Sequence, residues 1–187
     1  MKIAVYCGAD FGEEPAYIQA ARDLGKWIAD NGHELVYGGG DAGLMGTVAK
    51  AAFENGAHVY GVIPGNVGFI KDRPQPYVSE LIVTNNMSNR KEKMLEIADA
   101  FIALPGGIGT MDEITEAIVL TKIGVFNKAC IFFNKNGFYE PFRKMLDEMS
   151  RVKFIMPGTM EHVLFSDDLS EIESHILCYT TDNEEVQ

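Results

Sequence analysis

Residues 104–116, LPGGIGTMDEITE, place a glycine-rich turn one helical turn before a group of acidic side chains. A helix that begins near Gly109 or Thr110 would point unpaired backbone N–H groups and a partial positive charge at the turn, which favours a bound phosphate. The helix rises about 4.5 Å from Thr110 to Glu113, roughly the span of a sugar ring. We therefore expect Glu113 to reach the ribose and the glycosidic carbon of a ligand whose phosphate lies at the turn.

The same residues also allow a purely structural interpretation. Thr110 and Glu113 have the spacing of a capping box, in which Glu113 would bond the first amide of its own helix. Asp112 can complement the helix dipole, and Glu116 can belong to a solvated acidic face. The buried stripe of this helix would comprise Met111, Ile114 and Ile118. Both interpretations stay open at the level of sequence.

A candidate cation lies upstream in MSNRKEKM, residues 87–94. This segment follows the apolar run 80–84, and if that strand is adjacent to the strand at 100–104, Arg90 and Lys91 lie near the glycine turn. There they can orient a carboxylate or hold a phosphate. The alternative is that both residues merely open an ordinary charged helix.

The elements that must position these groups follow from the pattern of apolar residues. Short apolar runs alternate with longer helical patterns, which is typical of βαβ units and a parallel sheet covered on both faces. The runs predict strands at 3–7, 34–38, 58–63, 80–84, 100–104 and 129–133. The intervening patterns predict helices at 15–32, 43–56, 88–98, 110–124, 138–150 and 166–176, with Gly32, Gly56 and Gly124 at helix ends.

Three glycine-bearing loops follow predicted strands, at 7–12, 37–46 and 104–110. Ligands of a parallel sheet bind at the carboxyl ends of its strands, so these loops should share one site. Gly38, Gly40 and Gly43 form a G-x-G-x-x-G pattern, but the next strand does not end in the acidic residue that a dinucleotide site needs. The sequence lacks a P-loop. Residues 64–78, rich in Gly and Pro without a period, predict a long loop that covers the site.

Composition limits the classes of partner. A chain of 187 residues suits one domain, which we place at residues 1–178, followed by a disordered tail at 179–187. The net charge of −11 argues against nucleic acid and anionic membranes as partners. Cys7, Cys130 and Cys178 lack disulfide or metal spacing, and no long apolar segment is present, so we expect reduced thiols in a cytoplasmic protein.

Taken together, these motifs resemble the LOG (Lonely guy) family of cytokinin-activating phosphoribohydrolases. The resemblance covers about residues 2–178 and rests on Arg90-Lys91, on Pro105-Gly106-Gly107-x-Gly109-Thr110-x-x-Glu113 and on the upstream YGGGDAGLMG. It implies a Rossmann-like α/β fold, usually a homodimer, that hydrolyses the N-glycosidic bond of an N6-modified adenosine 5′-monophosphate. The products are the free base and ribose 5-phosphate, and neither a cofactor nor a metal is expected.

The resemblance also implies roles for individual residues. Arg90 and Glu113 form the catalytic pair, in which Glu113 stabilises an oxocarbenium-like sugar and activates water. Glu116 and Asp72 are candidates for the group that protonates the leaving purine. The substrate-binding residues that we expect are Gly39, Gly40, Asp72, Met87, Lys91, Gly106, Gly107, Ile108, Gly109, Thr110, Met111, Asp112 and Glu116.

The chain departs from the family pattern at several positions. Ala9 replaces a serine, Ser88 a histidine, Ile108 a tyrosine and Val119 a threonine, and these changes bear on substrate identity more than on fold. Members of the family often carry the label "lysine decarboxylase". A pyridoxal-phosphate decarboxylase commonly has a lysine after a histidine, and none of the histidines here precedes a lysine. The sequence argues against that label.

Two other functions compete with this interpretation. A phosphorylated-ligand carrier, such as a molybdenum-cofactor carrier, would use the same glycine turn without hydrolysis, but it would not need both Arg90 and Glu113. A general nucleotide hydrolase would act on AMP itself. The sequence does not separate AMP from its N6-modified forms.

Overall fold

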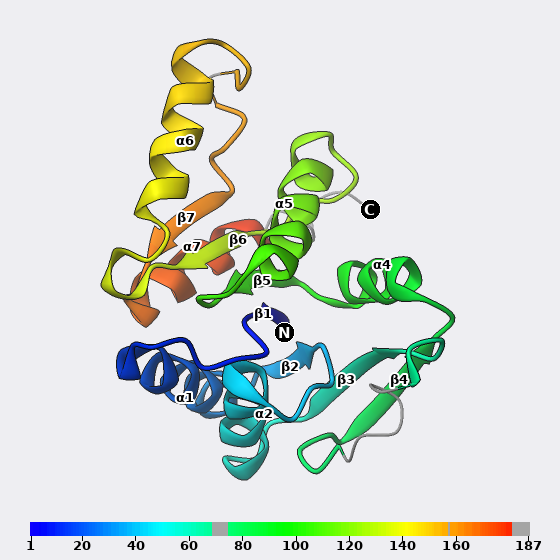
Figure 1. Cartoon of the computed structure of the whole chain (residues 1–187). Coiled ribbons are helices and arrows are strands. Elements are labelled where there is room, and N and C mark those ends of the chain that lie inside the picture. Colours follow the sequence, from blue (N-terminus) through cyan, green and yellow to red (C-terminus); the bar gives the residue numbers. More distant parts are fainter. Residues whose placement is uncertain (69–74, 157, 181–187) are drawn as a thin grey trace.

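A computed structural model describes residues 1–68, 75–156 and 158–180. In this part of the chain, seven strands form one parallel sheet in the order β4-β3-β2-β1-β5-β6-β7 (Figure 1). The strands are β1 (Lys2–Tyr6), β2 (Glu34–Tyr37), β3 (Val59–Pro64), β4 (Glu80–Thr84), β5 (Ala100–Ala103), β6 (Cys130–Phe133) and β7 (Val163–Ser166). The expected parallel α/β sheet is confirmed.

The helices alternate with the strands as the apolar pattern predicts. They are α1 (Pro15–Asp30), α2 (Gly43–Glu54), α4 (Met87–Ile97), α5 (Ile108–Lys122), α6 (Glu140–Arg151) and α7 (Leu169–Thr180), with a 3₁₀ turn, η1, at Lys135–Gly137. Gly32, Gly56 and Gly124 follow the ends of α1, α2 and α5 with φ of 67°, 93° and 79°. These left-handed positions explain why glycine stands there.

Two apolar layers cover the sheet. Leu24 of α1, Val48 of α2 and Ile172 of α7 pack in the core on one face. Met94 of α4 and Ile114 of α5 pack in the core on the other face. Figure 1 shows α1 and α2 on the opposite side of the sheet from α4 and α5. The two faces therefore bring different helix termini to the same carboxyl edge.

The strand order corrects one expectation. β4 pairs with β3 at the edge of the sheet and is not adjacent to β5, which pairs with β1 and β6. Arg90 approaches the glycine turn because α4 crosses back over the sheet from β4 to β5. The crossing makes β1 and β5 the topological switch point, where open α/β sheets bind their ligands.

Two further regions complete the comparison. The strand at Val163–Ser166 was not predicted, because it is a short edge strand whose first three residues are only half-buried. Part of the predicted loop at 64–78 and residues 181–187 of the predicted tail lie outside the described residues. Pro64 itself ends β3, and α7 continues to Thr180.

Candidate active site

A cavity of about 730 Å³ opens at the carboxyl edge of the sheet, over β1 and β5. All three predicted glycine loops contribute to its wall, at residues 7–12, 38–40 and 105–107. Helices from both faces of the sheet supply the remaining lining, which includes Tyr17 of α1, Met45 of α2, Arg90 of α4 and Glu113 of α5. The expectation that the three glycine loops share one cavity is therefore confirmed.

Backbone hydrogen bonds join these loops at close range. The N–H of Gly8 donates to the carbonyl of Pro105 at 3.1 Å, and the N–H of Met45 donates to the carbonyl of Gly8 at 3.2 Å. A Cβ atom on Gly106 would overlap the Thr110 hydroxyl and lie 2.8 Å from the Gly8 nitrogen. Gly106 is therefore required by close packing between the β1 and β5 loops.

The first turn of α5 is suited to an anion. The helix begins at Ile108, and its N-cap, Gly107, has no side chain to satisfy the first amides. Those N–H groups, together with the positive end of the helix dipole, lie beside cavity-lining Gly107, Gly109 and Thr110. The turn thus offers a phosphate several oriented donors without a lysine.

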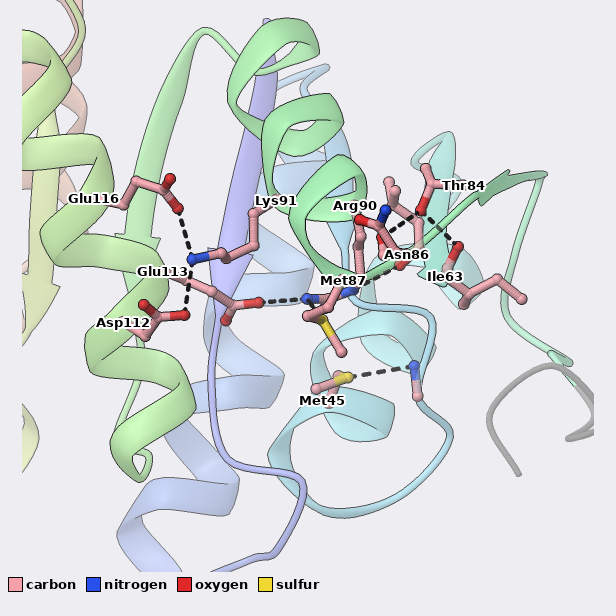
Figure 2. Close-up of polar contacts among 12 residues, drawn as sticks. Met45, Ile63, Thr84, Asn86, Met87, Arg90, Lys91, Asp112, Glu113 and Glu116 are labelled. Carbon is pink, nitrogen blue, oxygen red and sulfur yellow. Dashed lines mark hydrogen bonds and ion pairs between the residues drawn. The ribbon is translucent and has the colours of Figure 1, made fainter. Parts of the chain in front are cut away.

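The capping-box interpretation is wrong. Thr110 is the third residue of α5 rather than its N-cap, and its side chain is buried. No side chain caps the start of α5, and Glu113 Oε1 instead accepts a hydrogen bond from Arg90 Nη1 at 2.6 Å (Figure 2). The side chains of Arg90 and Glu113 are only 8% and 13% exposed. Glu113 is therefore one member of a nearly buried ion pair.

Arg90 is held by three partner groups, which bond two of its nitrogens. Its Nε donates to the carbonyl of Val62 at 3.0 Å, and its Nη1 also contacts Met87 Sδ at 3.6 Å (Figure 2). Arg90 leaves the first turn of α4, which is capped by Asn86 through a bond to the N–H of Asn89. A guanidinium with fixed partners can orient a carboxylate without rearrangement.

Burial and charge act on Glu113 in opposite directions. Removal from water raises the pKa of its carboxyl above the ordinary value, and this is the largest effect. The charge and hydrogen bond of Arg90 lower the pKa, whereas Asp112 raises it and Lys91 lowers it to a smaller degree. Arg90 thus favours the ionised form of a carboxyl whose pKa is raised by burial.

A second cluster of charges lies beside this pair. Lys91 Nζ contacts Asp112 Oδ2 and Glu116 Oε2, each at 2.9 Å (Figure 2). Hydrogen bonds to Asp112 and then Glu116 are the main reasons why the pKa of Lys91 is raised. Lys91 therefore stays protonated and ties α4 to α5 directly next to the Arg90–Glu113 pair.

The structure brings most of the expected site residues together. Those that line the cavity are Gly39, Gly40, Met87, Arg90, Lys91, Gly106, Gly107, Gly109, Thr110, Asp112 and Glu113. Ile108, Met111 and Glu116 are not part of its wall: Ile108 is exposed, Met111 packs against the core, and Glu116 pairs with Lys91. Asp72 lies outside the described residues.

Sequence reasoning missed an aromatic part of the wall. Phe11, Tyr17 and Phe138 line the cavity, and the rings of Tyr17 and Phe138 meet edge-on at 5.5 Å between centroids. Phe138 follows β6 just as the glycine turn follows β5. The carboxyl-edge rule could have found it, but an isolated aromatic residue in a loop carries little signal by itself.

Neither a metal centre nor a membrane-spanning helix is found in the described residues. No three His, Cys, Asp or Glu side chains gather there in a way that could hold a metal ion. Within the same residues, no helix combines the length and the apolar character that a bilayer span requires.

Comparison with known proteins places these features in a family. A family model described as "Possible lysine decarboxylase" matches residues 45–176. A cytokinin riboside 5′-monophosphate phosphoribohydrolase of Rhodococcoides fascians is 40% identical over 167 residues, or 89% of this chain and 84% of that protein. The phosphoribohydrolase LOG of Oryza sativa subsp. japonica is 43% identical over 146 residues, or 78% of this chain and 60% of that protein.

Solved structures share the fold. The molybdenum cofactor carrier protein of Chlamydomonas reinhardtii superposes with a TM-score of 0.71 over 96% of this chain and 98% of that protein, at 23% identity. Identity at this level supports the Rossmann-like architecture and does not extend to function.

Proposed function

We propose that this chain, which belongs to the family of the cytokinin riboside 5′-monophosphate phosphoribohydrolases, hydrolyses the N-glycosidic bond of adenosine 5′-monophosphate or an N6-modified form of it. The products are the free base and ribose 5-phosphate. The observation that carries this proposal is the Arg90–Glu113 pair, which lies in the same cavity as the open N-terminus of α5.

The arrangement gives the phosphate and the sugar of the substrate separate binding positions in the cavity. The phosphate binds the first turn of α5, and the sugar extends along the helix toward Glu113. Cleavage of the glycosidic bond develops positive charge on the sugar, which an ionised Glu113 stabilises while it orients the attacking water. Arg90 keeps Glu113 ionised and fixed. Because this chemistry is electrostatic, it requires neither a metal nor an organic cofactor.

The structure also argues against lysine decarboxylation. Such an enzyme needs an unprotonated lysine to form a Schiff base with its cofactor. Of the described residues that line the cavity, Lys91 is the lysine, and its ion pairs with Asp112 and Glu116 keep it protonated. We propose that the family description reflects an inherited label rather than the reaction of this chain.

A non-hydrolytic carrier is the second candidate, because carrier structures share the fold. A carrier gains nothing from a nearly buried Arg–Glu pair, since removing two charges from water is costly. The Arg90–Glu113 pair next to the proposed phosphate-binding position therefore favours hydrolysis of the ligand over its transport by a carrier.

The test is release of base by the purified protein from AMP and from N6-isopentenyl-AMP, measured side by side by chromatography. We expect turnover of at least one substrate and its loss in Glu113→Gln. Tight binding of both nucleotides without release of base would instead support the carrier. The ratio of the two kcat/KM values decides between a general AMP hydrolase and a cytokinin-activating enzyme.

We propose that the protein works as a homodimer. Among the apolar residues at the end of α5 and just after it, Leu120 and Phe126 pack against the core, whereas Val125 is 61% exposed. Other exposed apolar residues accompany it on and after α5 and α6: Val119, Ile123, Met145, Val152 and Phe154. α6 buries none of its residues and projects from the sheet (Figure 1). Exposed apolar surface of this extent favours a second copy as its partner.

A cytoplasmic location and a single domain at residues 1–178 complete the proposal. Cys7 and Cys130 are buried free thiols, and Cys178 is an exposed free thiol. Free cysteines are typical of reducing compartments and support this location.

A further inference from the structure

The guanidinium of Arg90 meets fixed groups at each of its nitrogens. Nε bonds the carbonyl of Val62, and Nη1 bonds Glu113. Nη2 faces the backbone of Gly38, in the loop that follows β2. A Cβ atom on Gly38 would overlap Nη2 and lie 3.4 Å from Cζ of Arg90. The guanidinium therefore occupies the volume that a side chain at position 38 would need.

Backbone conformation does not explain glycine at this position. Gly39 and Gly43 have φ of 72° and 60°, in the left-handed region that favours glycine, whereas Gly38 is not among the glycines with positive φ. The close approach of the Arg90 guanidinium, which leaves no room for a side chain, therefore explains why glycine stands at position 38. This separates Gly38 from Gly39 and Gly43, whose left-handed backbone itself favours glycine.

Met45 also limits the space at Gly38. Its Sδ lies 3.2 Å from the position of a Cβ on Gly38 and accepts a hydrogen bond from the N–H of Gly40 at 3.3 Å (Figure 2). The position of a Cβ on Gly38 is thus close to both a guanidinium and a thioether. An added methyl group must displace one of them, and Arg90 is the one in direct overlap.

We propose that Gly38 is a positioning residue for the reaction: its missing side chain lets Arg90 lie against the β2 loop and direct Nη1 at Glu113. The relevance to catalysis rests on the proposed function. The geometric part of the proposal is independent of the proposed function, because it concerns only how Gly38 affects the contact between Arg90 and Glu113.

The charge of Glu113 reports on this contact. The carboxyl is faced by Arg90 and Lys91 from α4, by Asp112 from its own helix and by Tyr6 and Cys7 from β1 and its loop. Burial raises the pKa of both Tyr6 and Cys7, so they stay neutral near pH 7. Displacement of Arg90 in Gly38→Ala removes the main influence that lowers the pKa of Glu113, which should therefore rise.

The experiment measures that pKa directly by carbon-detected NMR of carboxyl-labelled glutamate, with Glu113 assigned by comparison with Glu113→Gln. We expect the midpoint to rise by about one pH unit or more in Gly38→Ala. The matched control is Gly25→Ala in α1, where a Cβ would lie 2.5 Å from the carbonyl oxygen of Val48 in α2, remote from the pair. Gly25→Ala should lower stability and leave the Glu113 midpoint unchanged.

A double-mutant cycle with Gly38→Ala and Arg90→Lys tests the same contact through stability, which can be measured even if Gly38→Ala folds poorly. Lysine has no group at the position of Nη2, so Gly38→Ala should lower the urea midpoint in the Arg90→Lys background by roughly half or less of its effect in the wild-type protein. An unchanged Glu113 midpoint in folded Gly38→Ala, or an equal urea effect in both backgrounds, would overturn the proposal.

These readouts do not depend on turnover. If the wild-type protein releases no base from either nucleotide, the proposed function is wrong. The NMR and urea measurements still test whether Gly38 positions Arg90. If turnover is present, the acid limb of its pH profile should move to higher pH in Gly38→Ala together with the NMR midpoint.

Discussion

Replacement of Glu113 by glutamine tests the site most directly, because it removes the charge and keeps the shape. The amide oxygen can still accept the hydrogen bond that Arg90 Nη1 now donates at 2.6 Å, and the bond from Nε to Val62 is untouched. Truncation of a buried ion pair costs about 3–5 kcal/mol, but a retained hydrogen bond limits the cost to about 1–3 kcal/mol. The variant should therefore fold.

Its chemistry should fail, since an amide neither stabilises a positive sugar nor activates water. Groups of this kind contribute about 10²–10⁴-fold in rate, so we expect a loss of kcat in that range with little change in KM. The assay is base release from AMP or N6-isopentenyl-AMP under saturating substrate. Glu96→Gln is the control, because Glu96 forms an exposed pair with Lys93 on the same helix as Arg90. Unchanged kcat in a folded Glu113→Gln protein would refute a catalytic role.

Three more predictions follow from the same geometry. Arg90→Met removes the charge that lowers the pKa of Glu113. Because the ionised carboxylate is the active form, activity is lost as pH falls through this pKa, and the acid limb of the pH profile should move about one to three pH units higher. An unchanged acid limb would show that Arg90 does not control the charge of Glu113. Adenosine should be a poorer substrate than AMP by about 10²-fold or more in kcat/KM, because each of the two charged hydrogen bonds lost with the phosphate contributes about 1.5–3 kcal/mol. Equal turnover of adenosine and AMP would show that the glycine turn has only a structural role. Ile123→Asp should abolish the proposed dimer and give a monomer in sedimentation at assay concentration, while Phe53→Asp on α2 should leave the proposed dimer intact. An active wild-type monomer would contradict the dimer proposal.

The sequence was most informative where one local rule decides the outcome. The glycine turn after a buried strand predicted a helix N-terminus at a carboxyl edge, and α5 begins within two residues of that expectation. The three glycine loops were placed together for the same reason. Parallel strands end at one edge whatever their order, so these predictions needed no knowledge of the topology.

Strand order required information that local patterns lack. The prediction placed Arg90 near Glu113 by assuming that residues 80–84 lie beside residues 100–104, yet these strands are separated by β3, β2 and β1. The contact is nevertheless present because α4 spans that distance across the sheet. Likewise, Thr110 and Glu113 fit a capping box by spacing, and only the start of α5 at Ile108 shows that Thr110 lies inside the helix.

The crossing of α4 explains how the proposed catalytic carboxylate can follow the proposed phosphate-binding turn on the same helix. Without α4, the Glu113 carboxylate would be buried without a charged partner, and burial would raise its pKa further. α4 starts at the far edge of the sheet and brings Arg90 to Glu113 and Lys91 to Asp112. The two cations therefore pair with the acidic side chains of α5 and favour their ionised forms. They leave the N-terminus of α5 open for the proposed phosphate.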